Sequence, residues 1–219
     1  MNVWVVAIPV GFLIGSIPFG FIIARLKGVD IRKHGSGNIG ATNVGRVLGK
    51  KLGGICFVLD VLKGLLPTVG VGLAAGVIGS FEIAPREAWL WLAAMTAPVF
   101  GHMFSPWIGF KGGKGVATGL GSLVGVFPIL TYPALGAVVV WLVVTGVSRY
   151  VSLASCVAAL AIPALVAVEF AVLGRMESGV PFLAATGAIA LLVIVKHRTN
   201  LARLIRGEER KIGRPADPS

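Results

Sequence analysis

Apolar residues in this chain gather into seven segments of helical length, separated by short polar and glycine-rich stretches. A helix needs about 20 apolar residues to cross a bilayer, with a usable range of about 17–25. The fourth and fifth segments are the shortest and meet at Tyr132-Pro133, so merging them into one span, for a total of six, is the alternative. The predicted helices are 3–24, 52–75, 87–104, 115–131, 132–147, 151–173 and 180–195.

The placement of basic residues favours seven spans over six. With seven, nearly all Lys and Arg fall on one side of the bilayer, and the other side has only Arg86 and Arg175 among glutamates. Merging the short pair would move Arg149 across and set the basic C-terminal tail against the first loop. The positive-inside rule then predicts an N-terminus outside and a C-terminus in the cytoplasm. The basic side holds Arg25, Lys27, Arg32, Lys33, Arg46, Lys50, Lys51, Lys111, Lys114, Arg149 and the residues from Lys196 to Arg214.

The composition fits a polytopic, all-α integral membrane protein. The chain is 56% hydrophobic and 13% charged, whereas soluble domains carry about 25% charged residues. We expect one transmembrane domain over residues 1–213 and a short disordered tail over 214–219. The start of the chain has no basic residue before its apolar run, so it predicts a retained span and not a secretory signal. Cys56 and Cys156 lie inside apolar segments, where small buried core residues are expected.

The chain has a formal net charge of +11, and its basic residues cluster beside the predicted spans. Contact with anionic lipid head groups and a phosphorylated ligand explains this placement better than nucleic-acid binding does. A first glycine-rich loop follows the first span. Glycines let a backbone approach a ligand and turn its N–H groups inward, and an arginine can grip phosphate with two donors. The alternative is an ordinary interfacial loop whose glycines only make turns. The candidate phosphate-binding residues are Gly35, Ser36, Gly37, Asn38, Gly40, Thr42, Asn43 and Arg46, with Gly45 as a further glycine.

A second glycine-rich loop lies between the third and fourth spans. It does not match the P-loop pattern, because Gly115 follows the lysine and no strand precedes it, so an NTPase is not expected. The loop instead leads into a helix N-terminus, where free N–H groups and the helix dipole favour an anion. Simple contact with lipid head groups is the alternative for its lysines. The candidate residues are Lys111, Gly112, Gly113, Lys114, Gly115 and Thr118.

Three further groups are candidates. His102 stands at the end of the third span, either as a packing residue or as part of the site. Asp60 and Lys63 are three residues apart on one helix face within the second span, so they form a buried pair with a structural or a site role. The segment 200–209 is an amphipathic helix that lies on the membrane or reaches back as a lid with Asn200 or Arg203. A zinc site is not expected, because the histidines lack suitably spaced partners.

These segments resemble the bacterial membrane glycerol-3-phosphate acyltransferases that use acyl-phosphate as donor. The resemblance rests on three stretches in order, 35–43, 101–118 and 196–204 with Gly207 and Glu209, and on 60–64. Leu201 stands where the family more often has isoleucine. The resemblance implies acyl transfer to the sn-1 hydroxyl of glycerol 3-phosphate, giving lysophosphatidic acid and phosphate as the first step of phospholipid synthesis. It also implies a site lined by Ser36, Arg46, His102, Lys114 and Asn200, with Glu209 as the acid of the third motif.

The resemblance further implies an enzyme of the bacterial inner membrane, acting on its cytoplasmic face and needing no cofactor or metal. Its partners would be acyl-phosphate, glycerol 3-phosphate and membrane lipids, and we expect a monomer. Three alternatives stay open for the chemistry: His102 as general base, a substrate phosphate oxygen as base, or Ser36 as an acylated nucleophile. A transporter of a phosphorylated or anionic small molecule is the alternative function, but polar residues would then be expected near the midplane and repeated between halves.

Overall fold

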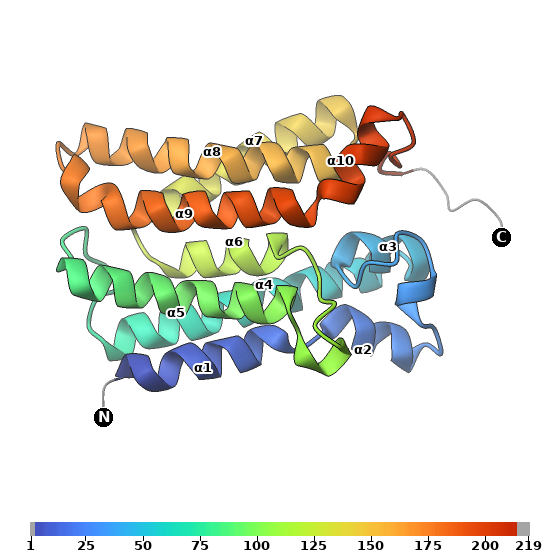
Figure 1. Ribbon diagram of the computed structural model, residues 1–219, viewed down its shortest axis with the longest axis horizontal. Helices are drawn as coiled ribbons and strands as arrows, with labels where there is room; N and C mark the ends of the chain where they lie inside the picture. Colours follow the sequence, from blue (N-terminus) through green and yellow to red (C-terminus); the bar gives the residue numbers. More distant parts are fainter. Residues whose placement is uncertain (1–2, 214–219) are drawn as a thin grey trace.

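The computed structural model describes residues 3–213, and within this range every regular element is a helix. Figure 1 shows the long helices lying side by side, with α1, α4, α5 and α6 on one side and α7, α8 and α9 on the other. The N-terminal half contains α1 (Val3–Ser16), α2 (Phe19–Leu26), α3 (Ala41–Leu48), α4 (Lys50–Ala74), α5 (Pro85–Met103) and α6 (Val116–Gly125). The C-terminal half contains α7 (Thr131–Ser148), α8 (Val151–Val172), α9 (Met176–Lys196) and α10 (Arg198–Ile205). Two short 3-10 turns, η1 (Ile31–Lys33) and η2 (Pro106–Ile108), lie in loops of the N-terminal half.

All seven predicted apolar segments contain a helix, but several boundaries differ from the prediction, most of all in the first and fourth segments. The first segment is interrupted at Ile17-Pro18, so α1 and α2 are two separate helices. The fourth ends at Gly125 and not near residue 131, and Pro128, which has no backbone N–H, lies in the turn that follows. The break between the fourth and fifth segments therefore lies before Thr131, whose hydroxyl donates to Val124 O at 2.8 Å. The predicted tail, residues 214–219, lies outside the described residues.

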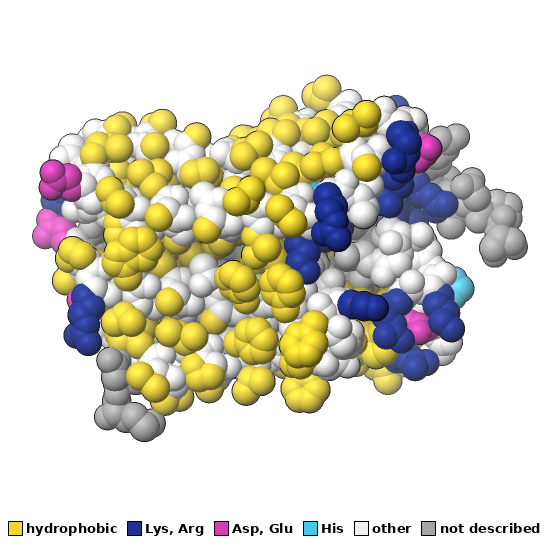
Figure 2. All heavy atoms as spheres, viewed as in Figure 1, with side chains coloured by type: hydrophobic (Ala, Val, Ile, Leu, Met, Phe, Trp, Pro, Cys, Tyr) yellow, Lys and Arg dark blue, Asp and Glu magenta, His cyan; other side chains and the backbone are white. Residues whose placement is uncertain are grey.

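Five helical stretches in the described range are long and apolar enough to cross a membrane: 3–26, α4, α7, α8 and α9. The other two predicted spans fall short, since α6 has ten residues and α5 is long enough but less apolar. Figure 2 shows a broad hydrophobic surface over the middle of the bundle, with Lys and Arg gathered toward one end. A multi-pass membrane protein follows, whereas seven crossings and the orientation of the termini stay predictions.

Glycines bring pairs of helices in the N-terminal half into backbone contact. A methyl group added at Gly64 of α4 would come within 2.8 Å of Ser122 Oγ on α6, and one at Gly121 would meet the backbone of Val61. On the other side of the half, Gly15 of α1 lies against the Pro98 backbone of α5. In a bilayer, burying apolar side chains between helices gains little, because lipid tails are equally apolar. Close packing at small residues therefore drives the association of helices. The ends of these helices, and the loops they carry, are therefore fixed relative to one another.

One hydrophobic core joins the two halves. The cluster of buried residues runs from Trp91 and Leu123 in the N-terminal half to Val166 and Phe170 in the C-terminal half. Trp91 also donates its indole N–H to Thr68 O at 3.1 Å, so its polar atom is satisfied inside the bundle.

Replacing Gly121 with alanine should destabilise the protein, because the added methyl would displace the α4 backbone at Val61. Overpacking of this kind costs about 1–3 kcal/mol. The matched control is Gly70→Ala in α4, where the added methyl would meet no atom within 4 Å. That control should be neutral or stabilising, since alanine is favoured over glycine in a helix by about 0.8–1.0 kcal/mol. Thermal unfolding of the purified protein in detergent measures both, and equal stability of the two variants would contradict the packing argument.

Candidate active site

A polar cavity of about 140 Å³ lies at the end of the bundle where the two glycine-rich loops and the C-terminal segment meet. Its walls come from three stretches that are far apart in the sequence, and Figure 1 shows those stretches together at the end that carries α2, α3 and α10. The lining contains three cationic, two amide and two hydroxyl side chains. These residues are Ser36, Gly37, Asn38, Lys114, Lys196, Thr199, Asn200 and Arg203.

Asn43 holds the first loop in shape. Its side-chain oxygen accepts the Ser36 N–H at 2.8 Å, and its amide donates to Asn38 O at 2.8 Å and His34 O at 3.1 Å. Gly35 has a φ of +61°, and a methyl group there would collide with the Asn43 side chain. Asn43 is itself buried, so it positions Ser36 and Asn38 at the cavity instead of lining it.

The second loop lies directly on His102. The Gly113 N–H donates to His102 O at 3.0 Å, and a methyl group on Gly113 would overlap the imidazole at Nε2. His102 is only 4% exposed and is not among the residues that line the cavity. After Lys114, Gly115 takes a φ of +80° and α6 begins at Val116, so the first turn of that helix follows the lysine directly. Free N–H groups at such a helix start favour a nearby anion.

A hydrogen-bonded network joins the second loop to the C-terminal segment. Lys114 Nζ donates to Asn200 Oδ1, and Asn200 Nδ2 donates to Glu209 Oε1 at 2.7 Å. Glu209 also accepts from Ser152 Oγ at 2.8 Å and from Arg203 Nε at 2.9 Å. Glu209 thus ties α8, α10 and the segment after α10 together, and it fixes the amide that holds Lys114.

Burial and like charges shape the titration of these groups. Burial lowers the pKa of Lys114 to about 8, with Arg203 and Arg46 adding to the effect and Glu209 opposing it. Burial lowers the pKa of His197 to about 4, helped by the charge of Lys114. Burial also lowers the pKa of Arg46. For Glu209, burial would raise the pKa, but hydrogen bonds from Asn200, Ser152 and Arg203 outweigh it and hold the pKa below its usual value. The site is therefore a partly desolvated cationic surface, which an anion would stabilise.

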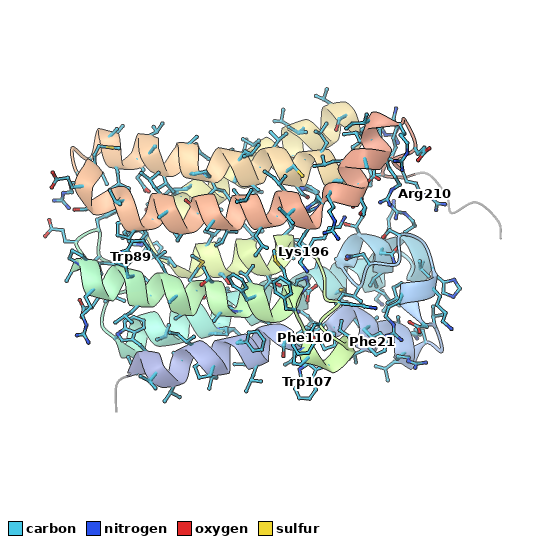
Figure 3. The ribbon with its side chains drawn as sticks, in the orientation of Figure 1. Phe21, Trp89, Trp107, Phe110, Lys196 and Arg210 are labelled. Carbon is cyan, nitrogen blue, oxygen red and sulfur yellow. The ribbon has the colours of Figure 1, made fainter. Side chains whose placement is uncertain are left out.

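Lys196 lies at the seam between the two halves, as Figure 3 shows. Its ammonium donates to Met103 O at 2.9 Å and lies 4.0 Å from the centre of the Phe104 ring. This lysine reaches from the end of α9 to the end of α5 while also lining the cavity. It therefore adds a second ammonium beside Lys114 on the cavity wall.

A second polar group lies deeper, below the loop. Lys63 Nζ is 2.7 Å from Asp60 Oδ1 and donates to Ile17 O at 2.8 Å, a carbonyl at the break between α1 and α2. His102 Nδ1 is 3.7 Å from the same Asp60 oxygen. Asp60 and Lys63 are both almost fully buried, so the pair is compensated inside the bundle and supports His102 from beneath.

The structure brings some of the predicted residues to the cavity and places others elsewhere. Ser36, Gly37, Asn38, Lys114, Asn200 and Arg203 line it. Thr42 and Lys111 are exposed outside the lining, and Thr118 is buried in α6 against Gly64. The remaining predicted glycines and Asn43 belong to the loops but do not line the cavity. Arg46 and Glu209 also lie outside the lining, and Glu209 contacts it through Asn200 and Arg203. Three contributors were not predicted: Lys196, Thr199 and Ser152.

A sequence signal existed for two of the three, because Lys196 and Thr199 flank His197-Arg198 within the tail motif. Ser152 carries no such signal, since it is one serine at the start of an apolar helix and gains meaning only from its contact with Glu209. Among the described residues, no three His, Cys, Asp or Glu side chains come close enough to hold a metal ion. The arrangement suits a phosphate-bearing ligand held by ammonium, guanidinium, amide and backbone N–H donors.

A helical, multi-pass membrane protein with a cationic site at one end of its bundle is the class that this fold and cavity define. The sequence matches the family described as Glycerol-3-phosphate acyltransferase over residues 5–207. The chain therefore belongs to the glycerol-3-phosphate acyltransferase family.

Similar proteins agree along nearly the whole chain. A glycerol-3-phosphate acyltransferase of Trichlorobacter lovleyi is 44% identical over 200 residues, covering 91% of this chain and 93% of that protein. One of Anaeromyxobacter dehalogenans is 46% identical over 205 residues, covering 92% and 94%. The crystal structure of PlsY (YgiH), an integral membrane glycerol 3-phosphate acyltransferase, in its glycerol 3-phosphate form is 41% identical and superposes with a TM-score of 0.81, covering 96% of each chain. Its lysophosphatidic acid form gives 0.78 at 40% identity, covering 96% of this chain and 95% of that one.

The lowered pKa of Lys114 gives a prediction for anion binding. The lysine is charged below a pH of about 8 and loses its charge above it, so binding of inorganic phosphate should weaken as the pH rises from 7.5 to 9.5. We expect a loss of roughly tenfold, measured by isothermal titration calorimetry on the purified protein.

Lys114→Arg should flatten this dependence, because an arginine stays charged throughout that range. Lys111→Arg, in the same loop but exposed, should leave the wild-type pH dependence in place. An identical decline in wild type and in Lys114→Arg would show that another group controls binding.

Proposed function

We propose that this protein transfers a fatty acyl group from acyl-phosphate to the sn-1 hydroxyl of glycerol 3-phosphate. The products are lysophosphatidic acid and inorganic phosphate. The observation that carries the proposal is the single cavity lined by Ser36, Lys114 and Asn200, with Lys196 and Arg203 beside them. Family membership supports the acyl transfer, and the chemistry of the cavity supports a phosphorylated donor as well as a phosphorylated acceptor.

The reaction needs little covalent help from the protein. Acyl-phosphate is a mixed anhydride, so phosphate leaves readily when a hydroxyl attacks the carbonyl carbon. A bond forms between the glycerol oxygen and the acyl carbon, the acyl–phosphate C–O bond breaks, and the hydroxyl proton passes to a base. The protein must hold two phosphates near each other and stabilise the charge that develops on the carbonyl oxygen. Ammonium, guanidinium and backbone N–H groups supply that stabilisation.

We assign the roles by position. Lys114 and Asn200 bind the substrate phosphate next to the reacting carbonyl, because they line the cavity and are hydrogen-bonded to each other. Ser36 and Asn38 present donors from the first loop, and Arg46 adds positive charge behind it. Lys196 and Thr199 extend the binding surface toward α9. Glu209 keeps Asn200 and Arg203 in place.

A substrate phosphate oxygen is the base that fits this site best. His102 lies beneath Gly113 and outside the cavity lining, so the loop separates it from a hydroxyl bound in the cavity. The described lining contains no histidine or carboxylate that could activate Ser36, which speaks against an acylated serine. His102 therefore supports the loop that carries Lys114.

We place the site on the cytoplasmic face of the bacterial inner membrane. The cavity lies at the end of the bundle where Lys and Arg gather, and cytoplasmic ends of membrane proteins are enriched in these residues. The acyl chain of the donor would remain among the apolar helix surfaces, and the protein would act as a monomer on two substrates without a cofactor.

The donor is tested with purified protein, labelled glycerol 3-phosphate and either palmitoyl-phosphate or palmitoyl-CoA. Lysophosphatidic acid should form from palmitoyl-phosphate alone, with release of one phosphate per product. Product from the thioester alone would keep the acyl transfer and overturn the donor. No product from either, with folded protein, would favour a transporter of phosphorylated molecules, and uptake of glycerol 3-phosphate into proteoliposomes would then be measured.

His102→Gln should reduce activity without abolishing it, because the imidazole supports the loop and does not take the proton. A general base contributes about 10²–10⁴-fold, so we expect a loss below about 100-fold and an unchanged pH profile of kcat/KM. A larger loss, with one limb of the pH profile missing, would restore His102 as the base.

A further inference from the structure

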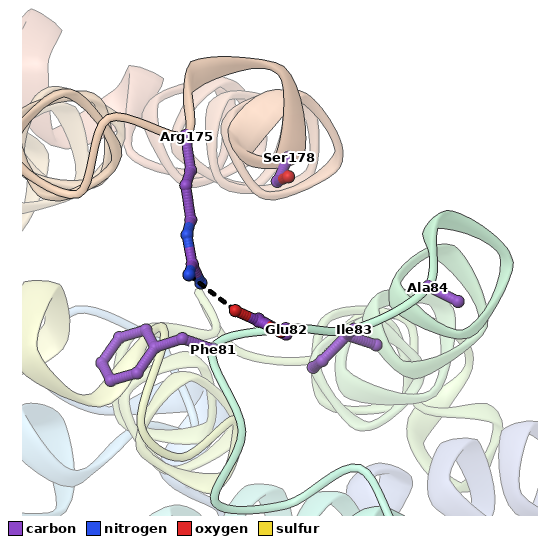
Figure 4. Close-up of a pocket in the computed structure, with 6 residues that line it drawn as sticks. All are labelled: Phe81, Glu82, Ile83, Ala84, Arg175 and Ser178. Atoms are coloured by element: carbon purple, nitrogen blue, oxygen red, sulfur yellow. Dashed lines mark hydrogen bonds and ion pairs between the residues drawn. The ribbon is translucent and has the colours of Figure 1, made fainter.

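A second cavity in the described part of the chain lies at the other end of the bundle from the site. It has a volume of about 420 Å³, within the range of about 300–1,000 Å³ that ligand pockets occupy. Figure 4 shows its walls, formed by the loop between α4 and α5 and by the turn between α8 and α9. The lining residues are Phe81, Glu82, Ile83, Ala84, Arg175 and Ser178.

Two opposite charges face each other across this cavity. Arg175 donates to Glu82 Oε1 at 2.6 Å, and the side chains are 42% and 76% exposed. An ion pair so exposed contributes little to stability, so exchanging it for contacts with a ligand costs little. The carboxylate and the guanidinium thus satisfy each other while each remains open to a partner of opposite charge.

Both charges stand on ordered turns. Ser80 Oγ accepts the Glu82 N–H at 2.9 Å and donates to Glu82 O at 2.8 Å. The Arg175 N–H donates to Phe170 O at 2.9 Å, and Gly174 before it takes a φ of +66° that ends α8. The two charged side chains therefore start from hydrogen-bonded turns in two separate connections.

Apolar side chains form part of the cavity wall. Phe81 and Ile83 pack against the core that joins the two halves. Trp89 is 47% exposed, and Figure 3 shows it on α5, at the same end as this cavity. Tryptophan favours the boundary between lipid and water, where its ring is in lipid and its N–H reaches polar groups. A tryptophan at the lipid–water boundary would place the charged pair at the level of lipid head groups.

We propose that this cavity binds the head group of a zwitterionic phospholipid. The guanidinium of Arg175 holds the lipid phosphate and the carboxylate of Glu82 holds its ammonium group, replacing their bond to each other. The apolar residues below accept the start of the acyl chains. An anionic lipid without an amine would leave Glu82 unpaired beside a phosphate, so the cavity discriminates between the two lipid classes. This lipid site is separate from the proposed acyl transfer and does not depend on it.

Native mass spectrometry of the whole protein in detergent tests the proposal, with phosphatidylethanolamine and phosphatidylglycerol of equal chain length offered together. Wild type should retain the zwitterionic lipid in preference. Glu82→Gln should lower that preference by about three- to tenfold, because one charge-assisted contact is lost. Arg175→Gln should weaken retention of both lipids. The matched control is Arg86→Gln, at the start of α5 but outside the lining, which should behave as wild type.

Unchanged lipid preference in Glu82→Gln and Arg175→Gln would overturn the proposal and leave the ion pair as a bridge between the two connections. Phosphoethanolamine binding as tightly as the whole lipid would overturn the lipid as ligand in favour of a soluble phosphorylated amine. Thermal unfolding of each variant should match wild type, since both side chains are exposed. Because lipid retention is measured without acyl transfer, either proposal can fail while the other stands.

Discussion

The close approach of helix backbones at glycine is the constraint on which the rest of this structure depends. Gly64 and Gly121 bring α4 and α6 into contact, and Gly15 and Gly101 do the same for α1 and α5. Within a bilayer there is little hydrophobic force between helices, so packing of small residues decides which helices associate. The contact between α4 and α6 fixes where α6 begins, and with it the position of Lys114 one residue before the Gly115 cap. The candidate site is thus placed by packing well inside the bundle.

Polar chemistry at the end of the bundle is built on that frame in two layers. In the lower layer Lys63 pairs with Asp60 and donates to the Ile17 carbonyl, and His102 lies beside Asp60 and beneath the second loop. In the upper layer Lys114 and Asn200 face the cavity, and the carboxylate of Glu209 fixes the amide. Burial of the cationic groups lowers the pKa of Lys114 and prepares the site for an anion, whose charge would offset the cost of desolvation. We therefore expect residues of the lower layer to act by positioning the loop, and residues of the upper layer to act by direct contact with a ligand.

The two ends of the bundle differ in kind. One end gathers many cations from three separate stretches around a small cavity of about 140 Å³. The other end has a larger cavity in which one cation and one anion face each other. An excess of positive charge suits substrates that carry phosphate, whereas a balanced pair suits a ligand that carries both signs. In the two proposals, the same fold would present an acyl-transfer site at one end of the bundle and a lipid-binding surface at the other.

The sequence by itself determined the helical membrane class, the seven apolar segments and the two glycine-rich loops, because hydrophobic length and glycine content are local properties. It also indicated Ser36, Lys114 and Asn200, since each stands in a dense polar stretch beside a span. Only the tertiary structure decided that His102 lies beneath Gly113, that Asn43 organises its loop, and that Ser152 donates to Glu209. It also ended the fourth helix at Gly125, well short of the predicted boundary. These outcomes depend on contacts between side chains that are far apart in the sequence. A local pattern of polar and apolar residues cannot predict such contacts.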